Sequence, residues 1–280
     1  MGNVIAKDPD FWCSTDDPGP ERHNADWMKR VSDSKFLSEL SIPGTHDTMT
    51  CSYSGVEGLW VWCQSWSLGI QLNMGIRFLD IRCQASNGDM LLNHGGYYLG
   101  TLLDTLNGCV NFLQTQPSEC IILRIKQENS SLEGLGFRDA MFPFLERFSD
   151  HIFFKTSMLT LGEARGKMVI LADYDMDGND HIMRYGCGMS ICDNWEPDSK
   201  EQKIDGIKDN INSAFSAVRD RKEMYITFTS YTWLADCPRE LARSANPIAH
   251  DFVRNHIGCL GIFVMDYPGF QIIRDIIDHN

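Results

Sequence analysis

The stretch Ser41-Ile-Pro-Gly-Thr-His46-Asp47 follows an apolar run at 37–42 that predicts a β-strand. Further runs rich in Ile, Leu, Val, Met and Phe recur at 76–82, 89–93, 120–126, 168–173, 188–192, 224–230 and 261–266. Most of these runs are continuous rather than alternating, as expected for parallel strands that are covered on both faces. The stretch at 41–47 therefore predicts the end of the first strand of a parallel sheet.

Helical periodicity fills most of the intervals between these strands. In the segment 101–114, Leu102, Leu106 and Leu113 recur at helical spacing, and Pro117 follows the segment. Similar patterns occur at 137–148, 202–220, 240–256 and 269–278. Strands with mostly helical crossovers predict an α/β fold, either a distorted (β/α)8 TIM-type barrel or an open doubly wound sheet.

Polar side chains collect where the predicted strands end. They are His46 and Asp47, Asp80 and Arg82, His94, Arg124, Lys126 and Glu128, Asp173 and Asp175, Asp193 and Trp195, Thr229 and Tyr231, and Asp266. In a barrel these strand ends converge on one mouth, whereas an open sheet spreads them along a line. The distribution favours the distorted barrel.

Length and charge limit the classes of protein and partner. The chain has 280 residues, is 43% hydrophobic and has a formal net charge of −13. This size suits a single barrel, so we expect one catalytic domain over 26–280, preceded by a polar arm at 1–25. An acidic protein repels a polyphosphate backbone, which argues against a nucleic-acid partner. No run approaches the roughly 20 apolar residues of a transmembrane helix. We also expect a monomer.

The cysteines and the N-terminal residues bear on the compartment. Ten cysteines are present and none lies in Cys-x-x-Cys spacing, which disfavours a zinc ribbon or a redox pair. Several lie in apolar runs, where a thiol behaves as a small hydrophobe. Residues 1–10 contain no apolar segment of signal-peptide length. Together these observations predict a cytoplasmic protein.

Two histidines, His46 and His94, stand on either side of Asp80-Ile-Arg82 in the sequence. Cleaving a phosphodiester without a metal requires one group that takes a proton from the attacking hydroxyl and another that protonates the departing oxygen. It also requires a fixed cation that holds the charged phosphorus centre. Imidazoles with a carboxylate and a guanidinium meet these needs, so the pattern predicts cleavage of a phosphodiester.

Several motifs occur in order and at compatible spacing along the chain. They are Ser41-Ile-Pro-Gly-Thr-His46-Asp47, Gly75-Ile-Arg-Phe-Leu-Asp80-Ile-Arg82, Asn93-His94-Gly95, Ile121-Ile-Leu-Arg-Ile-Lys126, Ala164-Arg-Gly-Lys167 and Val264-Met-Asp266-Tyr267. With them the chain resembles bacterial phosphatidylinositol-specific phospholipase C and its single X-domain relatives. The resemblance implies cleavage of phosphatidylinositol in membranes to diacylglycerol and inositol 1,2-cyclic phosphate.

The resemblance also implies roles for the proton-transfer groups. His46 is the expected general base for the inositol 2-hydroxyl, with Asp266 orienting its ring and stabilising the imidazolium. His94 is the expected general acid for the diacylglycerol oxygen, assisted by Asp47. Such proton transfers contribute about 10²–10⁴-fold each.

The resemblance further implies that no metal and no cofactor are needed. Arg82 is expected to contact a non-bridging phosphate oxygen, and Asp80 to hold Arg82 and His94 in place. Calcium-dependent relatives carry acidic ligands at the positions of Arg82 and Lys126. Two cations at those positions repel a divalent ion and can take over its electrostatic role, so we expect a metal-independent enzyme.

Recognition of the inositol ring is implied for three residues. Asp193 and Trp195 match the family positions at which an aspartate and a stacking aromatic contact the sugar, and Lys126 adds a further donor. Bacterial relatives also carry an inositol-contacting arginine after the fifth strand. This chain reads Leu171-Ala-Asp-Tyr174 there, without a basic residue.

Tryptophans cluster in segments that are expected to surround the active-site mouth. Trp60, Trp62 and Trp66 follow the first strand, and Trp233 follows the seventh. Exposed Trp favours the membrane–water interface, so we expect Trp62 and Trp233 to contact lipid. The alternative is that part of this cluster packs inward as ordinary core.

Two other functions remain as alternatives. A barrel phosphodiesterase of the glycerophosphodiester or sphingomyelinase D type calls for a metal site built from Glu-x-Asp after the second strand, which Asp80-Ile-Arg82 does not supply. A binding protein of the X-domain type with little catalytic activity is the second alternative. All the expected catalytic residues are present, which disfavours it.

Overall fold

Ten strands join in one sheet in the part of the chain that this computed structural model describes, residues 10–177, 181–217 and 223–280. They are β1 (Ile42–Thr45), β2 (Phe78–Ser86), β3 (Asp89–His94), β4 (Tyr97–Thr101), β5 (Ile121–Gln127), β6 (Met168–Asp173), β7 (Met183–Arg184), β8 (Met189–Cys192), β9 (Met224–Phe228) and β10 (Ile262–Met265). The order β7-β6-β5-β2-β1-β10-β9-β8 is parallel throughout. An antiparallel hairpin, β3–β4, extends β2.

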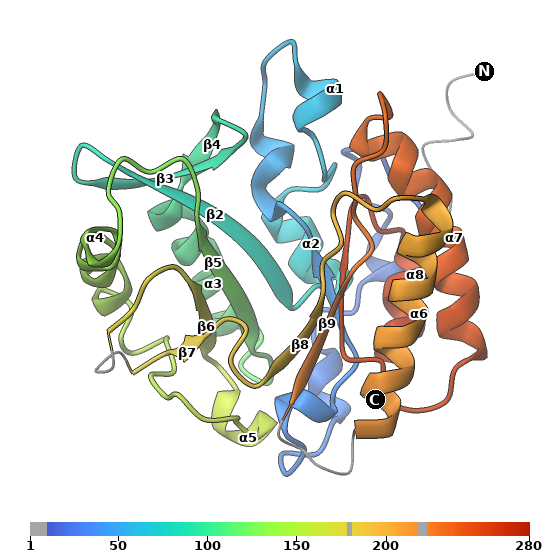
Figure 1. The fold of residues 1–280 in the computed structure, drawn as a ribbon. Helices are drawn as coiled ribbons and strands as arrows, with labels where there is room; N and C mark the ends of the chain where they lie inside the picture. Colours follow the sequence, from blue (N-terminus) through green and yellow to red (C-terminus); the bar gives the residue numbers. More distant parts are fainter. Residues whose placement is uncertain (1–9, 178–180, 218–222) are drawn as a thin grey trace.

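The parallel strands curl into an incompletely closed barrel (Figure 1). The path ends at β7 and β8, and no pairing joins these two strands among the described residues. The predicted distorted TIM-type barrel is therefore confirmed. Its distortion is an opening between β7 and β8 together with the added hairpin.

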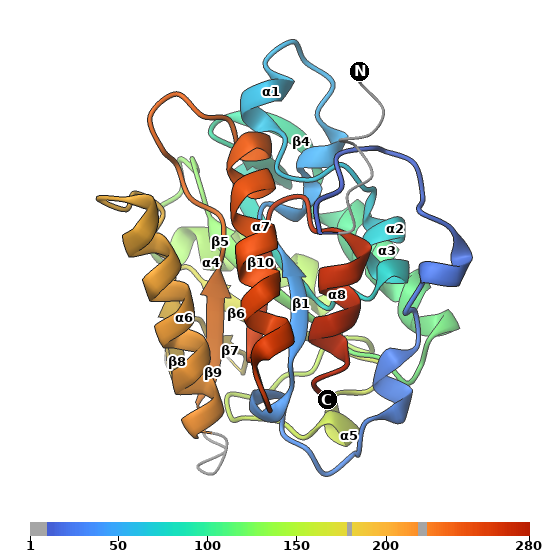
Figure 2. The same ribbon diagram turned by 90° about the vertical axis from the view of Figure 1, so that its right-hand side faces the viewer.

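Most of the helices cover the outside of the sheet, and two short ones lie beyond its ends (Figure 1). The helices are α1 (Gly58–Val61), α2 (Leu68–Met74), α3 (Leu102–Thr115), α4 (Leu135–Glu146), α5 (Leu161–Ala164), α6 (Lys200–Ala217), α7 (Pro238–Asn255) and α8 (Phe270–Ile277). Figure 2 shows α6, α7 and α8 side by side on one flank. In α8, Ile272, Ile273 and Ile276 are buried at helical spacing, which fixes that face against β1.

Two strand predictions need correction, and two strands, β4 and β7, were not predicted. The run at 37–42 is mostly a 3-10 turn, Leu37–Glu39, and the first strand begins only at Ile42. An apolar run alone does not distinguish a buried turn from a buried strand. The run at 89–93 is an antiparallel strand outside the parallel path. The remaining barrel strand, β7, has two residues, too few to leave a periodic signal.

The described part of the N-terminal arm packs onto the barrel through two aromatic residues. Phe11 and Trp12 are 1% and 3% exposed. The backbone N–H of Trp12 donates to the Tyr267 carbonyl at 3.1 Å, which ties the arm to the loop after β10. The boundary at residue 25 stays a prediction. None of the described helices combines the length and the apolarity that a membrane crossing requires.

Candidate active site

Two adjacent strands place the first histidine beside its carboxylate. Thr45 of β1 pairs with Met265 of β10, so His46 and Asp266 leave the sheet next to each other. The side-chain amide of Gln64 donates to the carbonyl of His46 at 2.7 Å and to that of Met265 at 2.8 Å. This amide fixes the two strand ends relative to each other.

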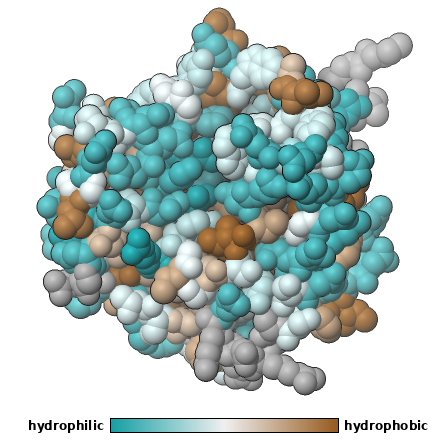
Figure 3. Space-filling model, viewed as in Figure 1, coloured by the Kyte–Doolittle hydropathy of each residue, from teal (hydrophilic) through white to brown (hydrophobic). Residues whose placement is uncertain are grey.

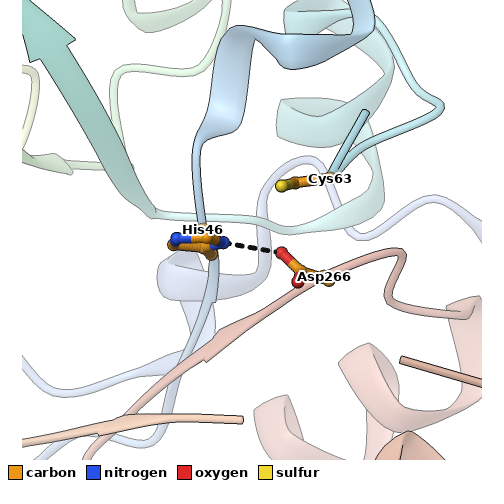
Figure 4. A group of neighbouring side chains, drawn as sticks. All are labelled: His46, Cys63 and Asp266. Carbon is orange, nitrogen blue, oxygen red and sulfur yellow. Dashed lines mark hydrogen bonds and ion pairs between the residues drawn. The ribbon is translucent and has the colours of Figure 1, made fainter. Parts of the chain in front are cut away.

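The His46 ring is held from both sides. Its Nδ1 lies 2.8 Å from Asp266 Oδ1, the contact drawn in Figure 4. Its Nε2 lies 2.8 Å from Nη2 of Arg82. Because a guanidinium has only donors, this second contact is a hydrogen bond only when Nε2 accepts. The geometry therefore fits a neutral ring whose proton is on Nδ1.

The surrounding charges favour proton uptake by the same ring. Burial lowers the pKa of His46, but the carboxylates of Asp266 and Asp47 outweigh burial and raise the pKa to about 9. The Arg82 contact and the raised pKa thus point to opposite protonation states at neutral pH. We take the neutral ring as the form that makes the hydrogen bond to Arg82, and the carboxylates as the groups that stabilise the ring once it has accepted a proton.

Asp47 lies between the two imidazoles in a left-handed backbone conformation, with φ 42° and ψ 56°. Its Oδ2 is 3.3 Å from Nε2 of His46 and 3.4 Å from Nε2 of His94. The other ring nitrogen of His94, Nδ1, donates to the Val61 carbonyl at 3.0 Å. The two histidines expected from the sequence thus face one carboxylate, in one site.

Arg82 is fixed by three carboxylates. Its Nε lies 2.7 Å from Asp47 Oδ1 and 3.7 Å from Asp80 Oδ2, and its Nη1 lies 3.0 Å from Glu128 Oε2. The side chain is only 16% exposed. A guanidinium held in this way presents its remaining donors in a fixed direction. Glu128 had no role in the sequence-based prediction, although it follows a strand end.

The predicted role of Asp80 is corrected in one respect. Asp80 contacts Arg82, but its other partners are the backbone N–H of Asp47 at 3.3 Å and Arg124 Nη1 at 3.2 Å. Among the described residues, His94 is held by Val61 and Asp47 instead. The reason is register: Asp80 of β2 pairs with Arg124 of β5, so the two side chains lie side by side on one face of the sheet. Burial raises the pKa of Asp80, but Arg124 and Arg82 outweigh burial and lower the pKa to about 2.

Arg124 is a site residue to which sequence reasoning gave no role. Its Nη2 lies 2.7 Å from Asp173 and its Nη1 lies 4.0 Å from Asp193. Its guanidinium carbon lies 4.3 Å from the centre of the Tyr185 ring. The chain has no arginine at 171–174, but the guanidinium of Arg124 in β5 reaches Asp173 at the end of β6. An arginine inside an otherwise apolar strand was the available signal.

The three residues predicted to bind the inositol ring lie beside the Arg124 guanidinium or further along the mouth of the barrel. Lys126 pairs in register with Asp173 and lines an open groove of about 540 Å³. Asp193 follows β8 and approaches Arg124. Trp195 is 58% exposed. Their roles in binding substrate stay predictions.

Cys63 was also missed, because it lies in an irregular segment without a pattern. Figure 4 shows its sulfur directed toward the His46–Asp266 pair. Burial, followed by the charges of Asp266 and Asp47, raises the thiol pKa well above its ordinary value. The side chain is therefore a protonated thiol close to His46 and Asp266.

The predicted lipid contacts differ in exposure. Trp62 is 38% exposed, whereas Trp66 of the same cluster is buried and belongs to the core. Trp233 is half-buried against Tyr231 and its neighbours. The next residue, Leu234, is 93% exposed. Figure 3 shows apolar patches at several places on this face, and one of them lies at the top of the molecule, over the region of α1.

Known proteins are similar to this chain in sequence and in fold. The 1-phosphatidylinositol phosphodiesterase of Listeria monocytogenes is 30% identical over 91% of this chain and 84% of its own length. The chain belongs to the phosphatidylinositol-specific phospholipase C family. The family model described as "Phosphatidylinositol-specific phospholipase C, X domain" matches residues 40–173.

Other members of the phosphatidylinositol-specific phospholipase C family agree with this assignment. The solved structure of the L. monocytogenes phospholipase C has a TM-score of 0.83 at 28% identity and covers 92% of this chain and 99% of its own. A structure of the Staphylococcus aureus enzyme has a TM-score of 0.81 at 20% identity, covers 93% and 99%, and supports the fold.

Proposed function

We propose that this chain is a phosphoric diester lyase that cleaves phosphatidylinositol to diacylglycerol and inositol 1,2-cyclic phosphate. The observation that carries the proposal is the position of Asp47 between His46 and His94, 3.3 and 3.4 Å from their Nε2 atoms. A base and an acid on either side of one carboxylate, with Arg82 fixed beside them, suit an in-line displacement at phosphorus. Family membership supports the same reaction.

In the proposed reaction His46 Nε2 takes the proton of the inositol 2-hydroxyl. The resulting oxygen forms the new bond to phosphorus while the bond from phosphorus to the diacylglycerol oxygen breaks. His94 Nε2 gives its proton to that leaving oxygen. Because the nucleophile is part of the substrate, positioning supplies much of the acceleration. Asp266 stabilises the imidazolium that forms at His46.

Arg82 takes the role that a divalent ion has in other phosphodiesterases. Its Nη2, which meets His46 in the free protein, can instead donate to a non-bridging phosphate oxygen. Asp47 and Glu128 hold the guanidinium at 2.7 and 3.0 Å, so little reorganisation is needed when charge develops on the phosphate. We therefore propose catalysis without a metal.

Contact with a membrane is proposed for the apolar rim of the mouth. Val56 is 97% and Trp60 52% exposed beside Trp62, and Leu234 is 93% exposed beside Trp233. Aromatic and aliphatic side chains exposed at a rim favour the interface. The S. aureus structure described above concerns the modulation of that enzyme's membrane binding. The cytoplasmic location and the monomeric state stay predictions.

Separate substitution of the two histidines tests the catalytic assignment. His46→Ala and His94→Ala are each expected to reduce kcat by about 10²–10⁴-fold, the usual contribution of one proton transfer. His23→Ala is the control, because His23 pairs with Asp17 on the arm, away from the site. Turnover of phosphatidylinositol in detergent micelles is the measurement, with circular dichroism to verify folding. Near-normal turnover in either site variant excludes that histidine from the reaction.

A further inference from the structure

A buried carboxylate oxygen without a hydrogen-bond partner lies between the two imidazoles. Asp47 is 2% exposed, and its Oδ2 makes no hydrogen bond with any described residue. Arg82 contacts the other oxygen, Oδ1, at 2.7 Å and leaves Oδ2 open. The guanidinium opposes a divalent ion at this carboxylate, but Asp80 and Glu128 also contact Arg82, at 3.7 and 3.0 Å, and offset its charge. Because an unpaired buried carboxylate oxygen is costly, its position marks a place for a proton donor or a cation.

His94 directs its Nε2, which is also an acceptor in the neutral ring, toward Oδ2 of Asp47. Its Nδ1–H donates to the Val61 carbonyl, so in the neutral ring Nε2 carries a lone pair. This lone pair faces Asp47 Oδ2 at 3.4 Å. Two acceptors in this position repel each other unless a positive charge lies between them. A backbone carbonyl on the far ring nitrogen is also the arrangement that orients metal-binding histidines.

Cys63 completes a set of three ligands. Its sulfur, a carboxylate oxygen of Asp47 and a ring nitrogen of His94 lie within 4.8 Å of one another. Tetrahedral zinc, with Zn–N and Zn–O bonds of about 2.0–2.2 Å, separates two such ligands by roughly 3.4 Å. That separation matches the 3.4 Å between Asp47 and His94. Thiolate, imidazole and carboxylate are together the ligand types that zinc prefers.

We propose that Asp47, Cys63 and His94 form an inhibitory binding site for Zn²⁺ or a similar thiophilic divalent ion. The ion binds where the Nε2 proton of His94 lies when this ring acts as general acid. One thiol proton is released to solvent, and water fills the fourth position. The ion thereby removes the acid that the leaving oxygen needs. Inhibition rests on the proposed function, whereas binding of the ion does not.

Cd²⁺ serves as a spectroscopic probe of binding. The full chain is treated with a chelator, desalted and titrated with Cd²⁺ while the ultraviolet charge-transfer band of a cadmium thiolate is followed. We expect the band in the wild type and in Cys51→Ser, a control thiol that is half-buried in the same segment. We expect its loss in Cys63→Ser. Absence of the band in the wild type, or its persistence in Cys63→Ser, overturns the proposal.

A second variant guards against misfolding of Cys63→Ser. In Cys63→Ala the melting temperature without metal reports folding, and added Zn²⁺ is expected to raise the melting temperature of the wild type but not of this variant. An equal rise in both proteins contradicts the site.

Inhibition is tested by Zn²⁺ titration of turnover, with recovery on adding a chelator. Cys63→Ser is expected to raise the inhibition constant by about 10–100-fold, the loss that even an outer-shell change causes at metal sites. Cys51→Ser is expected to leave it unchanged. Equal sensitivity of wild type and Cys63→Ser overturns the inhibitory role. If no protein turns over phosphatidylinositol, the proposed function fails, and the cadmium band still decides whether the site exists.

Discussion

His46 lies between one cation and two carboxylates, and this balance sets when it can act as a base. Arg82 donates to Nε2 at 2.8 Å and favours the neutral ring. Asp266 and Asp47 favour the imidazolium and, against burial, raise the pKa to about 9. Only the neutral ring can take the proton of the 2-hydroxyl. The rate is therefore expected to rise with pH as His46 loses its proton.

Asp266→Asn tests this balance. The variant keeps an acceptor for the Nδ1–H of His46 but removes the charge that does most to raise the ring's pKa. The pKa of His46 falls, so the rising limb of kcat/KM moves to lower pH. The maximal rate falls by up to about 10⁴-fold, as when a triad carboxylate becomes an amide. The measurement is the pH profile of both proteins in the presence of a chelator.

A remote pair supplies the matched control for this variant. Asp275 contacts Nε2 of the buried His250 at 2.8 Å, away from the site. Asp275→Asn is expected to leave the position of the limb unchanged. A limb that stays in place in Asp266→Asn, or moves equally in both variants, contradicts the assignment of His46 as the base.

At the scale of elements, the strand ends could be predicted from the sequence but the connecting segments could not. His46 and Asp266 directly follow apolar strands and Arg82 lies within one, and parallel pairing brings the carboxyl-end parts of such strands together. Cys63 and Gln64 belong to an irregular segment between β1 and β2, where no periodicity exists. Arg124 was visible as a polar residue in an apolar strand, yet only the register of β5 against β2 gives it Asp80 as a partner.

A buried ion pair joins two strands at the end of the barrel opposite the site. Arg77, just before β2, donates to Glu119, just before β5, at 3.0 and 2.8 Å, and both residues are 0% exposed. Glu119→Gln leaves a buried guanidinium without its counter-charge. The free energy of unfolding is expected to fall by about 3–5 kcal/mol. Urea denaturation at neutral pH measures it.

The exposed pair Lys200–Asp236 is the control for this loss of stability. Asp236→Asn is expected to change the free energy of unfolding by less than about 1 kcal/mol, because water already screens the pair. If Glu119→Gln costs no more than Asp236→Asn, the buried pair does not have the structural role assigned to it.

The rim segments give a prediction about vesicle binding. Trp60 and Leu234 are 52% and 93% exposed. Burying such side chains in lipid is worth about 1.5–3 kcal/mol each, so Trp60→Ser with Leu234→Ser is expected to weaken vesicle binding by about 10²-fold or more. Sedimentation with phosphatidylcholine vesicles measures the partition. Hydrolysis of a monomeric short-chain substrate is expected to be unaffected.

Ile257→Ser serves as the control for the rim. Ile257 is 81% exposed in the loop before β10, at the opposite end of the barrel. It is expected to leave vesicle binding unchanged. Unchanged binding in the Trp60 and Leu234 double variant contradicts membrane contact through this rim.

At the scale of the whole molecule, the barrel class was predictable and the closure of the barrel was not. The continuous apolar runs and the helical intervals predict a parallel α/β fold whatever the details of its loops. The two-residue strand β7 depends on pairing with β6 that so short a segment does not signal. The hairpin β3–β4 pairs locally, but its place outside the parallel path follows only from its antiparallel pairing with β2. With a net charge of −13, the molecule as a whole is not drawn to anionic lipid, so contact depends on the apolar rim.

The central claim is that two imidazoles and a guanidinium cleave phosphatidylinositol without a metal. Phosphorus NMR of the products formed from phosphatidylinositol vesicles, with and without a chelator, tests it most directly. We predict a signal of inositol 1,2-cyclic phosphate that appears at the same rate in both samples. Formation of acyclic phosphate without a cyclic intermediate, or loss of activity in the chelator, contradicts the account.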